Sequence, residues 1–118
     1  MNFKDSKPIV VTKDGTVVKG LRIRNPHGFS IIIKANNVTV QECDLEGSIN
    51  IYGAVKNTVI QNNYIHDITP RGTSNFNKQF AGVTTTEGDN FGNPLVQPLG
   101  AENVTVRGNY FANNPSGI

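Results

Sequence analysis

Cysteine, long apolar runs and clustered charge are scarce in this chain of 118 residues. Its single cysteine, Cys43, excludes an intrachain disulfide, a zinc site built on cysteines and a CxxC redox pair. The longest apolar runs have three residues, against the roughly 20 that a membrane-spanning helix needs. The start, MNFKDSKPIVV, has no apolar h-region and predicts no signal peptide in the given chain. We therefore expect no membrane partner.

Charged residues make up 17% of the chain, and the formal net charge is +2. A protein that binds nucleic acid by neutralising phosphates usually has a basic cluster, and this sequence has none, so we expect no nucleic-acid partner. A hydrophobic content of 36% exceeds that of a disordered chain. The length fits one domain, and we predict a single domain over residues 1–118.

Strand and turn residues are abundant instead. The chain has 16 Asn, 12 Gly, 12 Val and 11 Ile, but only 4 Leu. Valine and isoleucine favour strands, whereas asparagine and glycine favour tight turns. A short chain of strands and turns is typical of a repeat protein.

One nine-residue pattern occurs four times in the sequence. Its copies are GTVVKGLRI (15–23), NVTVQECDL (37–45), NTVIQNNYI (57–65) and NVTVRGNYF (103–111). A second motif precedes the later copies at 28–33, 48–51 and 82–85, and Pro8–Val11 fits the same place. Alternate residues are apolar, so Val38 and Val40 point inward on a strand. A unit of 20 residues cannot bury its own apolar face, which predicts a solenoid of stacked units.

Cys43, Asn63 and Asn109 occupy equivalent places between two strands of the repeat. We predict a sharp corner there, in which an Asn adopts a left-handed conformation and stacks its amide on the next copy. Cys43 is interpreted as a buried filler rather than a reactive thiol. Two further segments, Asn37–Thr39 and Asn103–Thr105, match a glycosylation sequon, but their place at repeat corners favours a role in turns.

The units NNVTVQECDLEG, KNTVIQNNYIHD and ENVTVRGNYFAN resemble the repeats of right-handed parallel β-helix proteins, the pectate-lyase-like superfamily. The resemblance covers nearly the whole chain and implies about four coils, each with three strands and three turns. It places first strands near 8–12, 28–34, 48–53 and 81–86, second strands near 16–19, 37–41, 57–61 and 103–107, and third strands near 21–24, 44–46, 64–68 and 110–112. No stretch of the sequence shows a sustained apolar stripe of helical period, and a sandwich or antiparallel barrel would not need this phased repetition.

The third strands present charged residues outward. Arg22 stacks beside Asp44, and Arg24 beside Glu46 and His66, with alternating sign. A His beside a carboxylate can be a catalytic pair, but a structural charge ladder is the favoured interpretation. His66 and Asp67 are adjacent on a predicted strand and should therefore point to opposite faces.

The first strands carry the candidate binding surface. Their outward residues are Ser30, Ile32 and Lys34, then Asn50 and Tyr52, then Thr84 and Thr86. Amides and hydroxyls can hydrogen-bond a sugar, and an aromatic ring can pack on its face. Two insertions, 69–80 and 87–102, flank this face and should form the walls of a cleft. In the resembling family the substrate groove lies in this place. We therefore predict substrate binding by Asn50, Tyr52, Thr84 and Thr86.

A lyase acting on uronic acids needs a cation to neutralise the substrate carboxylate and a base to remove the α-proton. Arg71, Lys78 and Lys34 are the candidates for these tasks, and Glu87 with Asp89 could hold calcium. Against an enzyme, the first-strand face has no pair of carboxylates of the kind that glycoside hydrolysis uses. Whether the chain is catalytic stays open.

The resulting hypothesis is a carbohydrate-active β-helix that binds, and by extension cleaves, an extended polysaccharide that can contain uronic acids. The alternative is a structural or assembly module, such as part of a tail spike, an adhesin or a stacking scaffold. The resemblance implies an extracellular or cell-surface location. Since no cap is evident at either end of the solenoid, we expect a fragment of a longer chain or self-stacking between copies.

Overall fold

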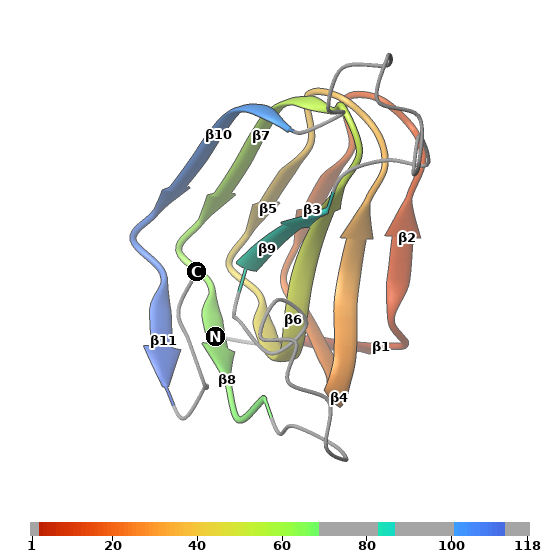
Figure 1. The fold of residues 1–118 in the computed structure, drawn as a ribbon. Coiled ribbons are helices and arrows are strands. Elements are labelled where there is room, and N and C mark those ends of the chain that lie inside the picture. The colour runs from red at the N-terminus through yellow and green to blue at the C-terminus, as the bar shows by residue number, and fades with distance from the viewer. Residues whose placement is uncertain (1–2, 69–82, 87–100, 113–118) are drawn as a thin grey trace.

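The computed structural model describes residues 3–68, 83–86 and 101–112, and within these ranges the chain is all β (Figure 1). The strands are β1 (Lys4–Ser6), β2 (Ile9–Val11), β3 (Val17–Lys19), β4 (Leu21–Ile33), β5 (Thr39–Gln41), β6 (Asp44–Tyr52), β7 (Lys56–Gln61), β8 (Tyr64–His66), β9 (Val83–Thr86), β10 (Glu102–Arg107) and β11 (Tyr110–Ala112).

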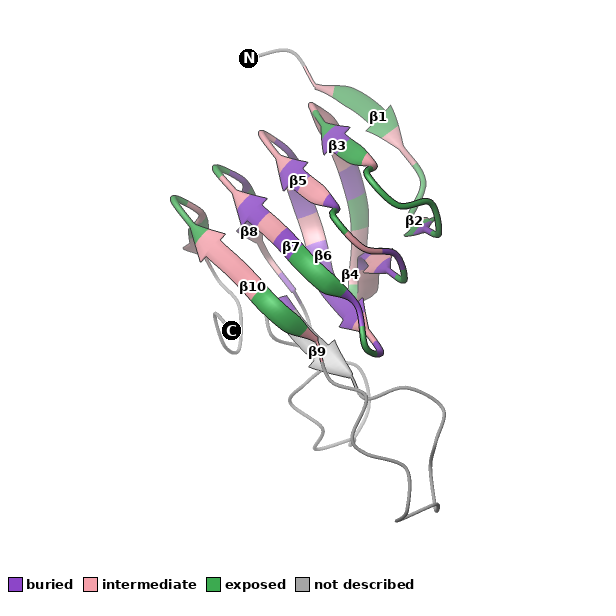
Figure 2. Ribbon diagram, turned by 90° about the horizontal axis from the view of Figure 1, so that it is seen from above, coloured by how far each residue is buried: buried purple, intermediate pink, exposed green. Residues whose placement is uncertain are grey.

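These strands form two sheets, and every strand pair is parallel. One sheet has the order β10-β7-β5-β3. The other has the order β1-β4-β6-β8-β11, with β2 paired to β4 and β9 paired to β6. Figure 2 shows the four strands β3, β5, β7 and β10 side by side in one layer, with β4 and β6 behind them. Parallel strands that follow one another in successive repeats are compatible with a β-helix-like solenoid, as the sequence predicts.

The pairing follows the register of the repeat. Val18 lies beside Val40, Val40 beside Ile60, and Ile60 beside Val106. These steps of 22, 20 and 46 residues equal the offsets between the sequence copies. Like residues therefore stack on like residues along the direction in which the units follow one another.

The core lies between the two sheets and consists of the inward residues of the repeat. Val38, Val40, Leu45, Ile60 and Ile65 are fully buried, which confirms the predicted inward positions. Isoleucine and valine dominate because their branched side chains suit the pleated surface of a strand. Figure 2 shows the buried positions as bands across neighbouring strands.

Left-handed residues form the corners between strands. Gly20, Glu42, Asn62 and Gly108 have φ between 54° and 70° and occupy equivalent places in four repeats. The predicted left-handed Asn is therefore displaced by one residue, because the turn uses the position just before Cys43, Asn63 and Asn109. A second set of corners uses Gly15, Asn37, Asn57 and Asn103, so the sequon asparagines do serve turns.

The predicted amide ladder is present beside these corners. The Asn63 side-chain oxygen accepts the backbone N–H of Cys43 at 3.0 Å, and the Asn109 oxygen accepts that of Asn63 at 2.9 Å. The Asn63 amide in turn donates to the carbonyl of Val40 at 3.1 Å, as Asn109 donates to Ile60 at 2.9 Å. Each Asn thus joins two repeats by satisfying corner groups that a buried turn would otherwise leave unpaired.

Cys43 takes the place of an Asn in this ladder. Its side chain is 1% exposed, and its Sγ lies 3.3 Å from the carbonyl of Gln41. Burial raises the pKa of the thiol, so the reactive thiolate is disfavoured. The interpretation as a buried filler fits this environment.

The third and first strands are not always separated by a turn. β4 and β6 each run continuously through both predicted strands, and register shifts between Arg24 and Ile31 take up the extra residues. This bulge also overturns the outward placement of Ser30, which is fully buried and donates to the carbonyls of Gly47 and Ser48 at 3.1 Å. A bulge interrupts the strict alternation of sides on which that placement depended.

Strand β1 was not predicted from the sequence. Lys4, Asp5 and Ser6 pair with Leu21, Arg22 and Ile23, so β1 fills the third-strand place of one further repeat. Its three residues, KDS, include no apolar side chain, so the alternation of apolar and polar residues that marks a strand is absent.

Gly47 offers the sharpest test of the bulge. It has φ +153°, and a Cβ there would lie 2.7 Å from the carbonyl oxygen of Asn25. We expect Gly47→Ala to lower the free energy of unfolding by about 1–3 kcal/mol from backbone strain alone, with the clash added to it. The control is Gly20→Asn, since Gly20 has open space and Asn62 holds the equivalent corner, and it should cost less than about 1 kcal/mol. Equal losses in urea unfolding would contradict this account of the bulge.

The amide ladder predicts a second stability difference. Asn63→Ala leaves the buried N–H of Cys43 and the carbonyl of Val40 without their partners, at about 1–3 kcal/mol for each buried group. Cys43→Asn should be tolerated, because an amide there can extend the ladder toward Asn63. Thermal unfolding of both variants tests these two expectations. If Cys43→Asn is destabilised while Asn63→Ala is as stable as wild type, the ladder does not join the repeats.

Candidate functional site

The outward face of the first strands gathers the candidate residues that the structure describes. Asn50 of β6 pairs with Ile32 of β4 and with Thr84 of β9, and Tyr52 pairs with Thr86. The pairing therefore brings Asn50, Tyr52, Thr84 and Thr86 into one patch, with Lys34 beside it. For Thr84 and Thr86 this statement concerns the backbone position only.

Lys34 and Tyr52 form the clearest contact on this face. The Lys34 ammonium nitrogen lies 4.7 Å from the centre of the Tyr52 ring, a cation–π geometry. Lys34 is exposed and Tyr52 is half-buried. Asn50 is only 5% exposed, so most of its amide is closed to a ligand in solution. The arrangement can offer one positive charge and one aromatic surface to a bound molecule.

The remaining predicted site residues belong to the two insertions. Arg71 and Lys78, predicted as catalytic, and Glu87 and Asp89, predicted as calcium ligands, lie outside the described residues. The same holds for most of the two insertions that were expected to flank the face. These assignments stay predictions.

The outward face of the third strands carries the predicted charge ladder. Arg22 pairs with Asp44 at 3.2 Å and Arg24 with Glu46 at 3.3 Å. Arg24 is 67% exposed, so its pair adds little to stability. The alternation of sign follows from the parallel register, as the sequence predicted.

His66 lies between two carboxylates. Its Nε2 is 2.5 Å from Oδ1 of Asp44, and its Nδ1 is 2.7 Å from Oδ2 of Asp67. The expectation that His66 and Asp67 point to opposite faces is therefore wrong. β8 ends at His66, and Asp67 adopts φ +54°, which turns its carboxylate back toward the ring.

The pKa of His66 is raised above its usual value of 6.5. Burial alone lowers it, but hydrogen bonds to Asp67 and Asp44, together with their negative charges, outweigh that effect. The imidazolium form can donate from both nitrogens to the two carboxylates at once. Neither Asp44 nor Asp67 was predicted as a partner of His66, because the first contact is diagonal between strands and the second depends on a left-handed residue.

Aromatic rings continue this face toward β11. The ring of Tyr64 stacks on His66 at 4.0 Å between centroids and on Tyr110 at 5.3 Å. Tyr110 is 65% exposed. The stack joins Tyr64 and His66 of β8 to Tyr110 of β11, so it suits a role in linking neighbouring strands.

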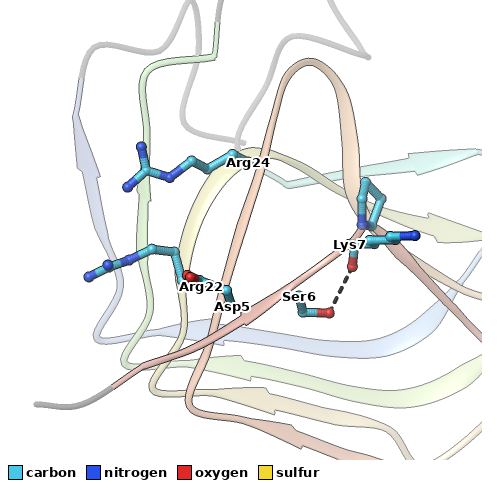
Figure 3. Close-up of a pocket in the computed structure, with 6 residues that line it drawn as sticks. Asp5, Ser6, Lys7, Arg22 and Arg24 are labelled. Carbon is cyan, nitrogen blue, oxygen red and sulfur yellow. Dashed lines mark hydrogen bonds between the residues drawn. The ribbon is translucent and has the colours of Figure 1, made fainter.

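A shallow groove of about 400 Å³ lies where β1 passes β4. Its lining residues are Asp5, Ser6, Lys7, Pro8, Arg22 and Arg24. Figure 3 shows that the side chains of Arg22 and Arg24 extend away from Ser6 and Lys7. The cations therefore do not converge on one point, and the groove lacks the geometry of an anion site.

No protein-family model, curated protein or solved structure shows a significant match to this chain. The part of the chain that the structure describes contains no helix capable of crossing a membrane.

The geometry around His66 predicts a pH dependence of stability. A pKa that is raised in the folded state gives stabilisation that is fully present below the unfolded pKa of about 6.5 and is lost as the pH rises through the folded value. Wild type should therefore lose stability relative to His66→Gln as the pH rises above about 6.5. The measurement is the urea midpoint as a function of pH, in the presence of a chelator.

The control for this titration is His27→Gln, which changes the chain's other histidine and should keep the wild-type pH dependence. Asp67→Asn should weaken the dependence, because it removes one of the two charges that face the ring. Parallel curves for wild type and His66→Gln would contradict the assignment.

Proposed function

We propose that this chain is a right-handed parallel β-helix of about four coils, of the pectate-lyase-like type, that binds an extended polysaccharide over its first-strand face. The repeat motifs and the parallel register support the architecture. An extracellular or cell-surface location, which the resemblance to pectate-lyase-like proteins implies, is part of this proposal.

The observation that carries the binding proposal is the pair of Lys34 and Tyr52. An ammonium held 4.7 Å above an aromatic ring supplies a charge for a uronate carboxylate and, next to it, an apolar surface for a pyranose ring. Tyr52 ends β6, Lys34 directly follows β4, and β9 continues this side of the sheet beyond β6. A surface that extends over several repeats suits a polymer better than a compact ligand.

Cleavage would extend the binding proposal. No carboxylate lies at an outward position of the described first strands, so an acid pair for hydrolysis is missing from this part of the molecule. A β-elimination would instead use Lys34 with Arg71 and Lys78, and calcium held by Glu87 and Asp89 would neutralise the substrate carboxylate. We therefore propose binding as the function and lyase activity as its extension.

A structural or assembly module is the second candidate, and the ladders favour it. Asn57 donates to Asn37 at 3.0 Å, Asn103 to Asn57 at 2.6 Å, and Gln61 to Gln41 at 2.8 Å. Side chains that hydrogen-bond to one another between repeats stiffen a solenoid, and they leave no reactive group exposed for catalysis. Self-stacking of copies, or a longer parent chain, would extend the same ladders.

The binding proposal predicts a selective loss on changing the first-strand face. Tyr52→Ala and Lys34→Gln should each weaken binding of an oligouronate by about tenfold, the effect of roughly 1.4 kcal/mol. The matched controls, Tyr110→Ala and Lys19→Gln, change exposed residues on other faces and should bind as wild type does. A glycan array followed by calorimetry measures both sets.

Absence of any glycan binding by wild type would refute the proposal, and so would equal losses in the control variants. Formation of unsaturated product with and without calcium tests the lyase extension separately. If copies sediment as a concentration-dependent assembly and bind no glycan, the structural alternative is favoured.

A further inference from the structure

Glu46, His66 and Asp67 place three metal-ligating groups at one point of the third-strand face, away from the proposed glycan surface. Each offers one donor atom, and these atoms lie within 4.8 Å of one another. Two carboxylate oxygens and one imidazole nitrogen form a mixed set that suits transition metals, whereas calcium prefers oxygen donors alone.

Two neighbouring strands and the corner that follows one of them position these groups. Glu46 lies on β6 and His66 on β8, which are neighbouring parallel strands. Asp67 follows β8 directly and is turned back by its left-handed backbone. Two of the donors therefore come from strands whose separation is fixed by backbone hydrogen bonds.

Asp44 orients the His66 ring from the side opposite Asp67, which a chance group of acids would not do. Its Oδ1 accepts from Nε2 of His66 at 2.5 Å, while Nδ1 faces Asp67 on the other side of the ring. A carboxylate on one imidazole nitrogen orients the ring and raises the basicity of the other nitrogen, as is usual behind metal-bound histidines. Asp44 is itself fixed by Arg22 at 3.2 Å.

One side of the cluster is open to solvent. The His66 side chain is 12% exposed, whereas that of Asp67 is 47% exposed, so solvent reaches the cluster from the Asp67 side. Metal–donor bonds of about 2.0–2.2 Å require the donors to draw together, which rotation of Glu46 and Asp67 can provide. Arg24, the partner of Glu46, is mostly exposed and can turn away.

We propose that Glu46, His66 Nδ1 and Asp67 bind one divalent transition-metal ion of the zinc type, with Asp44 as the positioning residue behind His66. The ion takes the place of the proton between His66 and Asp67 and links β6, β8 and the corner that follows. Water completes its coordination on the exposed side. The site is independent of glycan binding.

Calorimetry with Zn²⁺ on the untagged chain tests the proposal, with Ca²⁺ as the comparison ion. We expect one Zn²⁺ per chain and much weaker binding of Ca²⁺. Glu46→Gln should weaken Zn²⁺ binding by at least about tenfold, and Asp44→Asn by about 10–100-fold, as is typical of outer partners. Glu102→Gln removes the carboxylate of another ion pair, with Lys56 at 3.5 Å, and should leave binding unchanged.

Nitrogen NMR of the imidazole separates this site from adventitious binding. Zn²⁺ should shift Nδ1 of His66 as a metal-bound nitrogen while Nε2 stays protonated, and His27→Gln should leave the titration unchanged. The proposal fails if the chain binds no Zn²⁺, if Glu46→Gln and Glu102→Gln bind equally, or if the signal follows His27. Glu46→Gln keeps the test valid even if a His66 variant does not fold.

Discussion

Backbone hydrogen bonding between parallel strands in register is the constraint on which this molecule depends. It places each residue beside its counterpart one repeat away, so Val40 lies between Val18 and Ile60. Equivalent positions in successive repeats therefore have similar environments, and the same type of residue suits each of them. The buried isoleucines and valines, the left-handed corners and the amide ladder all follow from that repetition.

The repeat allowed much of the fold to be predicted from the sequence. Inward residues such as Val38 and Leu45 were identified because alternation and repetition agree on them. The pairs of Arg22 with Asp44 and Arg24 with Glu46 followed from the same register. What escaped prediction breaks the repeat locally: Ser30 turns inward at a bulge, and β1 has no apolar residue to mark it.

The candidate sites were less predictable for a related reason. The patch of Asn50 and Tyr52 follows from register, but the 5% exposure of Asn50 does not. The contacts of His66 depend on a diagonal distance and on the φ of Asp67, and neither quantity is contained in a period. Functional side-chain clusters in this solenoid thus form where side chains depart from simple stacking. The repeat period does not predict those departures.

The outer faces divide into two kinds. Over much of the second-strand and third-strand faces, side chains satisfy one another between repeats, as Gln61 does with Gln41 and Arg22 with Asp44. Such ladders stabilise the stack and leave few polar groups available to a ligand. The exception is the cluster of His66 with the carboxylates around it. The first-strand face instead presents Lys34 above Tyr52, and it is the surface on which the proposed function depends.

The most direct test of this account is a set of nuclear Overhauser contacts across the strands β3, β5 and β7. Parallel pairing in register predicts contacts of Val40 with both Val18 and Ile60, without the short Hα–Hα contacts of antiparallel strands. Observation of short Hα–Hα contacts between these strands, or contacts displaced by one residue, would contradict the stacked register.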